Sequence, residues 1–420
     1  MIENMVTENT KTTWLGKFPA HWKVLRIKNL FQEIDKRSET GSEELLSVSH
    51  YTGITLKRES LENEDDHISN AESLVGYKLV EKNDLVINIM LAWNGSLGIS
   101  PYNGMTSPAY CVYRIKGENN PEYFGYLFTT NLFKAEFRRN STGIIDSRLR
   151  LYSDKFFSIF TVVPPKEEQD KIVQYIKAQE EKINLFIQKK KQFIGLLKEQ
   201  KNLIAFSVIH LNGIQKEYPE RRIKSFSQIL RGKFTHRPRN DERLYDGEYP
   251  FIQTGEVSQA GKYINNYRQT LNDWGYSVSK EFPKGTLCLT IAANVGDVAI
   301  LNFNACFPDS IVGIIPNEEV DLHFLYHALK SLKAKFLSEA TLTTQYNLNI
   351  ERIGPIKIPI PNLLEQKKIV LEIETETAVI DKTIAKAELE IELIKEYKEA
   401  MIAEAVIGER NINFEKDQII

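Results

Sequence analysis

The side chains best suited to chemistry in this sequence are cations and amides that gather in turn-rich segments. The densest group lies within residues 221–240, which carry seven Arg or Lys residues and no acid. Cations bind phosphates, and an arginine can also hold a guanine edge through two hydrogen bonds. We therefore expect DNA contact here, and the alternative is a solvated basic loop. The candidate contact residues are Arg231, Lys233, Thr235, His236, Arg237 and Arg239.

Amide side chains form a second group of candidates. Gln345, Tyr346 and Asn347 are consecutive, and glutamine or asparagine can pair with adenine through two hydrogen bonds. An equally open interpretation is that they cap turns, which asparagine favours. Trp93-Asn94 and Asn294 fall in turns that follow two similar strand-like runs. They could reach a DNA groove, although a purely structural turn is the simpler interpretation.

The first half of the chain has a basic cluster of its own, made up of Arg138, Arg139, Arg148 and Arg150. Two of these arginines alternate with Leu149 and Leu151, so a strand would place both cations on one face. The cluster is predicted to contact DNA as the basic segment of the second half does. The alternative is an amphipathic surface strand.

Motifs for catalysis are missing. The sequence has neither the GxxxxGK[ST] phosphate loop nor the Asn/Asp-Pro-Pro-aromatic phrase of an adenine methyltransferase site. His323 and His327 stand four residues apart, but the residues between them lack the glutamate of a zinc protease, which favours an ordinary packed helix. Asp309 has no matching acid-x-Lys pair of a nuclease. We expect no catalytic residue, no metal site and no cofactor.

The composition is that of a soluble globular protein of two or three domains, with 420 residues, 42% hydrophobic and 26% charged. No apolar run approaches the roughly 20 residues that span a bilayer. The three cysteines lie far apart, which argues against a disulfide framework and fits a reducing cytoplasm. The net charge of −2 is a weak argument against DNA binding, because binding depends on where the charges lie.

Two long segments, 166–211 and 362–407, are predicted to be helices. Their apolar residues recur at spacings of mainly three, four and seven, which makes one stripe on a helix. Because a long helix with one narrow stripe is not stable alone, we expect the two to pair as an antiparallel coiled coil about 65 Å long. The predicted pairing residues are Ile176, Ile183, Ile187, Ile194, Leu197, Ile204, Ile373, Ile380, Ile384, Ile391, Ile394 and Met401.

The stretches before the two helices also repeat. Residues 84–90 and 286–291 are strand-like, and each is followed by a turn and then by a helical pattern near Glu122 or Asp321. We predict an α/β (α+β) fold with two similar globular domains separated by two long antiparallel helices, related by pseudo-two-fold symmetry. The predicted parts are a first domain at 1–165, a helix at 166–211, a second domain at 212–361, a helix at 362–407 and a tail at 408–420.

Several phrases, in this order, resemble the specificity (S) subunit of type I restriction–modification systems, the HsdS family. Residues 14–22 (WLGKFPAHW) resemble its W-x-G-x-x-P-x-x-W opening, and 249–257 (YPFIQTGEV) the start of a second target-recognition domain. Residues 343–349 (TTQYNLN), 358–361 (IPIP) and Glu365-Gln366 resemble the passage into a conserved helix. The first copy keeps 162–165 (VVPP) and Glu168-Gln169 but has 148–151 (RLRL) in place of the Gln/Asn phrase. The resemblance covers essentially the full length.

The resemblance implies that each domain reads one half of a split double-stranded DNA sequence and that the helices set the gap between the halves. Two modification subunits would dock on the helix pair and methylate adenine, and restriction subunits would add translocation and cleavage. The S subunit itself would catalyse nothing. Phe186, Phe193 and Phe206 exceed what the pairing stripe needs. We interpret part of that surface as a docking area, and the alternative is a wider internal seam.

The leading hypothesis is therefore a cytoplasmic, sequence-specific DNA-binding subunit that recruits modification and restriction subunits. One alternative is a methyltransferase or nuclease with a catalytic site of its own, which a methylation assay on the purified chain would detect. Another is a coiled-coil interaction scaffold that does not bind DNA. Partner binding by such a scaffold would be insensitive to salt, whereas DNA affinity falls steeply with ionic strength.

Overall fold

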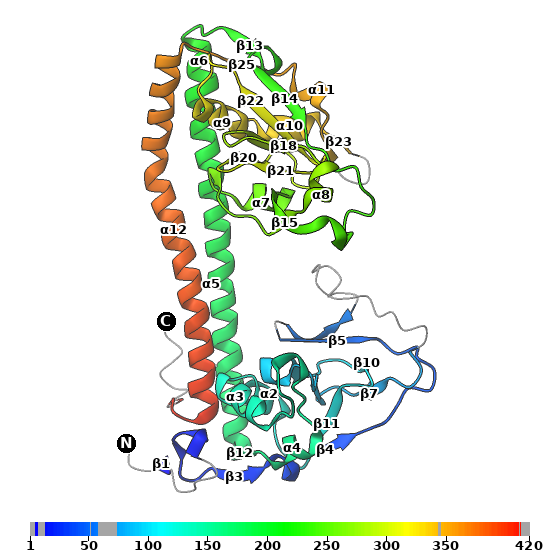
Figure 1. The fold of residues 1–420 in the computed structure, drawn as a ribbon. Coiled ribbons are helices and arrows are strands. Elements are labelled where there is room, and N and C mark those ends of the chain that lie inside the picture. Colours follow the sequence, from blue (N-terminus) through cyan, green and yellow to red (C-terminus); the bar gives the residue numbers. More distant parts are fainter. Residues whose placement is uncertain are drawn as a thin grey trace. The chain divides into compact units, whose positions relative to one another are not determined.

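The computed structural model describes residues 5–6, 13–50, 52–57, 74–342, 346–410 and 412, and the chain forms two compact units. Unit 1 comprises Met1–Lys189 and Glu390–Ile420, and unit 2 comprises Lys190–Leu389. The two long helices, α5 (Lys166–Phe206) and α12 (Leu363–Ile407), each contribute a segment to both units (Figure 1). Each unit therefore contains one strand-rich domain and two helix segments. The five-part division expected from the sequence stays a prediction.

Unit 1 is built on a four-stranded antiparallel sheet in the order β4-β11-β8-β9, and a separate antiparallel pair joins β3 to β12. Its strands are β1 (Met5–Val6), β2 (Phe18–Pro19), β3 (Lys23–Arg26), β4 (Phe31–Ile34), β5 (Leu46–Ser49), β6 (Gly53–Leu56), β7 (Lys78–Val80), β8 (Leu85–Ile87), β9 (Leu97–Ile99), β10 (Gly104–Thr106), β11 (Cys111–Ile115) and β12 (Phe160–Val163). Its short helices are α2 (Pro121–Phe128), α3 (Asn131–Asn140) and α4 (Ser153–Ser158).

Unit 2 is built on a five-stranded sheet in the order β14-β22-β19-β20-β16, and an antiparallel pair joins β13 to β25. Its strands are β13 (Glu220–Arg222), β14 (Ser227–Arg231), β15 (Tyr245–Phe251), β16 (Tyr263–Ile264), β17 (Gln269–Leu271), β18 (Glu281–Phe282), β19 (Leu287–Thr290), β20 (Val298–Leu301), β21 (Ala305–Cys306), β22 (Ile311–Pro316), β23 (Thr341–Leu342), β24 (Tyr346–Asn347) and β25 (Lys357–Pro359). Its short helices are α6 (Asn212–Gln215), α7 (Thr254–Gln259), α8 (Asp273–Ser277), α9 (Leu322–Ser331), α10 (Lys333–Glu339) and α11 (Ile350–Ile353).

The two units share one topology. Strands β4-β11-β8-β9 of unit 1 correspond in chain order and pairing to β14-β22-β19-β20 of unit 2. In both units helices follow the last of these strands in the chain, beginning with α2 and α3 in unit 1 and with α9 and α10 in unit 2. A later strand then pairs with the strand that immediately precedes β4 or β14, as β12 with β3 and β25 with β13. The predicted fold class, with two similar domains and two long helices, is confirmed.

Within unit 1 the two helix segments pack antiparallel to each other. Lys398 of α12 forms an ion pair of 3.0 Å with Glu180 of α5. Arg410, which follows α12, lies 5.6 Å above the ring of Tyr175, so the chain advances along α12 as it recedes along α5. Residues of both segments belong to the same core cluster as the domain, among them Ile172, Ile176, Ile183, Met401 and Ala405. The helices are therefore part of the core of unit 1.

Unit 2 has the same arrangement in its own helix segments. Lys201 of α5 forms an ion pair with Asp381 of α12. One small hollow is lined by Ala205 together with Ile373, and another by Lys198 together with Glu388, which again gives an antiparallel pairing. Ala205, Ile369 and Ile373 belong to the core cluster that contains the sheet of unit 2. Each domain is thus fused to its helix segments by one continuous apolar core.

Burial along the stripe follows the sequence pattern. The buried members of the predicted pairing set are Ile176, Ile183, Ile194, Ile373, Ile380, Ile384, Ile391 and Met401. The half-buried members are Ile187, Leu197, Ile204 and Ile394. Helix α5 ends at Phe206, and a π-helical turn at Ser207–Leu211 follows it. The apolar stripe is therefore the inward face of both helices.

A buried glutamine near the start of each long helix ties the domain to that helix. In unit 1 the Gln169 side chain accepts a 2.7 Å hydrogen bond from the backbone N–H of Asn120, the N-cap of α2, and donates to the Pro164 carbonyl at 2.9 Å. In unit 2 Gln366 accepts from the backbone N–H of Asp321, the N-cap of α9, at 2.7 Å and donates to the Pro361 carbonyl at 2.8 Å. Both glutamines are fully buried. Water cannot reach the polar groups at these junctions, so the glutamine side chains supply the hydrogen bonds that water would otherwise make.

We expect the substitution Gln169→Leu to destabilise unit 1 by about 2–4 kcal/mol, because it leaves a buried N–H and a buried carbonyl without partners. The matched control is Gln174→Leu, the same change at an exposed position of α5. Hydrogen exchange of the amides of unit 1 measures the difference. Equal losses of protection in the two variants would contradict the role of Gln169.

Candidate nucleic-acid interface

The basic segment of unit 2 leaves the sheet at the end of β14 and packs on the strands beside it. The backbone N–H of Lys233 donates to the Phe307 carbonyl at 3.0 Å. Gly232 passes so close that a Cβ there would lie 2.2 Å from the Pro308 carbonyl oxygen, which explains the glycine. Phe234 is buried against Phe251, with the ring centroids 5.1 Å apart. We call residues 231–246 the basic arm; its first part is anchored to the protein.

Asp309 collects three of the arginines on the arm. The Arg231 Nε donates to the backbone carbonyl of Asp309 at 2.8 Å. Arg239 forms an ion pair with the carboxylate of Asp309, and Arg237 lies 3.7 Å from its other oxygen. One carboxylate cannot neutralise three guanidinium groups, so the cluster remains cationic. The side chains of Arg237 and Arg239 are about half exposed, which leaves them accessible to phosphate.

The other candidates on the arm differ in how far the protein already uses their side chains. His236 bonds to the carboxylate of Asp241 at 2.9 Å, and Thr235 donates to the Val278 carbonyl at 3.3 Å. The Asp241 carboxylate also bonds Arg243, and the two partners, Arg243 first, hold its pKa well below the usual range. The Lys233 side chain is exposed. Thr235 and His236 therefore support the fold of the arm.

The amide candidates of unit 2 lie elsewhere in the unit. Asn294 is exposed in the loop after β19, and its carbonyl accepts a hydrogen bond from the Thr290 hydroxyl. The preceding residue, Ala293, has a positive φ of 62°, which marks a tight turn. Gln345 lies outside the described residues. For Tyr346 and Asn347 only the backbone, in β24, is described.

In unit 1 the structure brings two of the predicted candidates together. The guanidinium of Arg138 lies 5.3 Å above the Trp93 ring and also pairs with Asp146 at 2.6 Å. Trp93 donates its indole N–H to the Met90 carbonyl, within the short 3-10 helix Ala92–Asn94 and the turn around it. Arg139 pairs with the buried Glu136 at 2.7 Å. Arg138 and Arg139 are both exposed, so these cations face solvent.

The strand expected through Arg148 and Arg150 is wrong. Arg148 ends a 3-10 helix, Asp146–Arg148, and Arg150 forms only an isolated bridge with Thr142. The burial of the side chains still alternates although the segment pairs with no strand in the described part of the chain, because Leu149 and Leu151 are buried while Arg148 is exposed. A strand needs a partner along its length, and the sequence pattern alone could not show that this segment lacks one.

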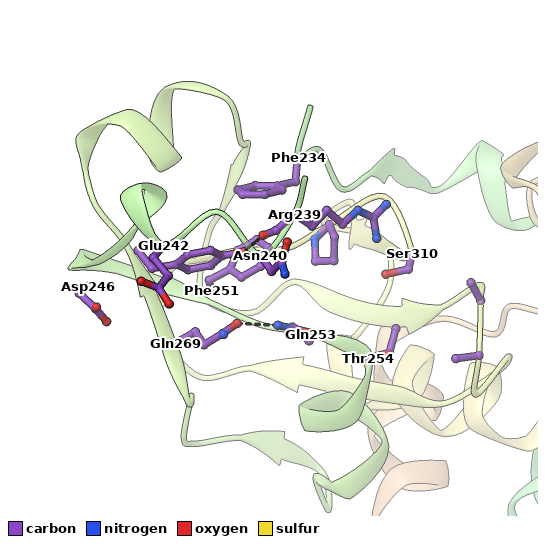
Figure 2. A pocket seen from close by; sticks show the side chains of 14 residues that line it. Phe234, Arg239, Asn240, Glu242, Asp246, Phe251, Gln253, Thr254, Gln269 and Ser310 are labelled. Carbon is purple, nitrogen blue, oxygen red and sulfur yellow. Dashed lines mark hydrogen bonds between the residues drawn. The ribbon is translucent and has the colours of Figure 1, made fainter. Parts of the chain in front are cut away.

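Sequence reasoning missed a hollow of about 710 Å³ in unit 2, which lies beneath the basic arm (Figure 2). Its polar lining includes Asn240, Glu242, Gln253 and Gln269 beside Arg239. Gln253 lies in the phrase at residues 249–257 that was recognised only as a family resemblance, and Gln269 stood in no recognised phrase. No local sequence pattern marks this hollow, because its lining residues come from several separate segments of the chain.

His323 and His327 occupy a packed helix, as the sequence indicated. The Nε2 atom of His327 is buried and lies 3.8 Å from a carboxylate oxygen of Glu374. Among the described residues, no group of three or more His, Cys, Asp or Glu side chains is placed to hold a metal ion. None of the helices in the described ranges combines the length and apolar character needed to cross a membrane.

Two buried histidines of unit 2 make its stability depend on pH. Burial lowers the pKa of His210 and of His327 to about 4. The unfolded chain binds protons near the ordinary pKa of about 6.5, so stability is lost as pH falls from there toward 4. For His210 the loss is about 2 kcal/mol near pH 5. We expect His210→Phe, which keeps the ring contact with Phe206, to reduce the acid sensitivity of unit 2. The measurement is the drop in unfolding temperature between about pH 7.5 and pH 5. The same drop in the wild type and in His210→Phe would contradict the expectation.

Comparison with known proteins identifies the class. The family model described as the type I restriction modification DNA specificity domain matches residues 215–393. A provisionally assigned type I specificity subunit of Mycoplasma pneumoniae is 26% identical over 66% of this chain and 70% of its own. The type I restriction enzyme MjaVIII specificity subunit of Methanocaldococcus jannaschii is 24% identical over 97% of this chain and 98% of its own.

The fold agrees with that assignment. A solved structure from a study of the assembly and conformational transition of the type I R-M system superimposes with a TM-score of 0.54, at 15% identity, over 94% of this chain and all of that one. Residues 215–393 thus match the type I DNA specificity domain, and the chain as a whole is similar to the specificity subunits of type I restriction–modification systems, the HsdS family.

Proposed function

We propose that this subunit reads a split DNA target, one half with the domain of unit 1 and the other with the domain of unit 2. The observation that carries the proposal is the repeat of one topology in both units, each with exposed arginines. A duplicated reader suits two separate stretches of one duplex. Phosphate contacts would orient the subunit, and contacts to base edges would supply the sequence preference.

The continuous helices support a spacing role for α5 and α12. Each domain shares its core with segments of both helices, so a change in helix length must change the path between the readers. Helix α12 alone has 45 residues, or about 65 Å of rise, which exceeds the ~34 Å of one DNA turn. The proposed role is therefore to set the unread gap between the half-sites.

Inserting one heptad in each helix, after Lys189 and after Leu389, tests this role. Seven residues keep the stripes nearly in phase and add about 10 Å, which corresponds to about three base pairs. We expect the gap to widen by that amount while both half-sites stay unchanged, as read from the methylated adenines in cells carrying the complete system. A heptad in one helix only is the control, because the two helices would then differ in length by about 10 Å although each domain packs on segments of both. Altered half-sites, or an unchanged gap, would refute the spacing role.

We further propose that the subunit acts without catalysis of its own and recruits two modification subunits and the restriction subunits in the cytoplasm. The supporting feature is apolar surface on α5 outside the pairing stripe. Phe186 is 38% exposed in unit 1, and Phe193 is 41% exposed in unit 2. Phe206, by contrast, packs partly against the core of unit 2 and beside His210, so it belongs to the internal seam.

We expect Phe193→Glu to abolish copurification with the modification subunit while the isolated chain folds normally, because a charge replaces exposed apolar contact area. Gln192→Glu is the matched control, since it adds the same charge at the adjacent exposed position of the helix. Copurification and circular dichroism are the two measurements. Unfolding of the Phe193 variant would favour the internal seam, and normal assembly would refute the docking role.

A further inference from the structure

We propose that the hollow beneath the basic arm of unit 2 reads base edges, and that Gln253 and Gln269 specify an adenine in the second half-site. The inference rests on the proposed function and deepens it. The hollow is bounded by the arm on one side and by β15 and β17 on the other. None of its lining residues except Arg239 was a candidate from the sequence.

The two glutamines form a pair held in place by the sheet. Gln269 begins β17 and is the register partner of Phe251, the last residue of β15, and Gln253 follows two residues later. The Gln253 amide donates to the Gln269 side-chain oxygen at 2.5 Å (Figure 2). The backbone N–H of Gln253 is fixed by Glu256 at 3.1 Å. Both side chains are exposed, and the bond between them restricts the rotamers that each would lose on binding a base.

The chemistry of an amide matches adenine. One glutamine amide can donate to adenine N7 and accept from the N6 amino group at the same time, which no other base edge in the major groove allows in that order. Each glutamine amide has two donor hydrogens and two acceptor lone pairs, so the bond between Gln253 and Gln269 leaves donors and acceptors unused. Asn240, on the opposite wall, forms no side-chain hydrogen bond with another described residue.

Charge is separated along the hollow, and this separation favours bases over phosphate as its occupant. Figure 2 shows Arg239 and Ser310 toward one end, Glu242 and Asp246 toward the other, and the glutamine pair between them. Two carboxylates repel the phosphate backbone, whereas a carboxylate accepts hydrogen bonds from base amino groups. The cations held by Asp309 stand at the Arg239 end, where the phosphate backbone beside the base can lie.

Packed aromatic rings support the wall of the hollow. Phe234 of the arm and Phe251 of β15 are buried against each other, and Tyr245 packs its ring 6.2 Å from Phe251. The arm is also anchored at Asp309, as described above. Polar groups on a rigid wall keep their geometry when the wrong base is presented, so a mismatch leaves them unpaired.

The test uses the complete complex with its modification subunits and a DNA library in which both half-sites are randomised. We expect Gln253→Ala and Gln269→Ala to lower discrimination for adenine at one position of the second half-site by about 5- to 150-fold. The first half-site and the salt dependence of nonspecific binding should not change. Gln228→Ala, at an exposed position of β14, is the matched control.

The variant Gln269→Glu adds a readout that loss of folding cannot imitate. A carboxylate accepts from the cytosine amino group but cannot donate to adenine N7, so the preference at that position should move from adenine to cytosine. An unchanged second half-site in all three variants, with normal thermal unfolding, would overturn the assignment. The assignment would equally fail if the alanine variants weakened every position of both half-sites to the same extent.

The wild-type complex separates this inference from the proposed function. If it selects no split target and its DNA affinity is insensitive to salt, the proposed function fails. If it selects a split target and the glutamine variants leave the second half-site unaltered, only the assignment of the hollow fails.

Discussion

The arrangement within each unit depends on one buried side-chain amide. Gln169 and Gln366 stand at the start of the long helices and bond in both directions, to the cap of a domain helix and to the carbonyl of the proline that precedes the long helix. A side-chain amide is neutral and carries its acceptor oxygen and its donor nitrogen on separate atoms, so it can bond two partners in different directions at once. Because the site is dry, breaking these bonds leaves unpaired polar groups. The domain therefore cannot pivot on its helix without a large penalty.

The apolar core has the same consequence on a larger scale. In unit 1, Phe124 of α2 and Ile176 of α5 belong to one cluster with Met401 of α12, and Tyr123 donates a hydrogen bond to the carbonyl of Val406. A reader built in this way moves only together with its helix segments. Rigid attachment is what a spacing device requires, because a flexible joint would blur the gap between two half-sites.

Features set by local periodicity were predictable from the sequence. The stripe of apolar residues that includes Ile176 and its repeat that includes Ile373 predicted both long helices, and α12 has the expected length. The repeated Glu-Gln phrase was visible, but its structural role was not, because the partners Asn120 and Asp321 lie about 45 to 50 residues away in the chain. The hollow escaped for the same reason, since its walls come from several segments. The alternation of Arg and Leu at 148–151 predicted correctly that the leucines are buried. It suggested a strand wrongly, because no neighbouring strand among the described residues pairs with this segment.

Charge explains why base contacts must carry much of the selectivity in the proposed function. Phosphate contacts supply affinity for any sequence, and Asp309 offsets part of the positive charge of the arginines on the arm. In the proposed function, a smaller nonspecific contribution would shorten the time that the subunit spends on unrelated DNA. Two readers on one chain then compensate, because the second half-site binds at the high effective concentration that the first creates. Modest contacts at each reader can thus yield high selectivity only where both half-sites occur at the correct spacing.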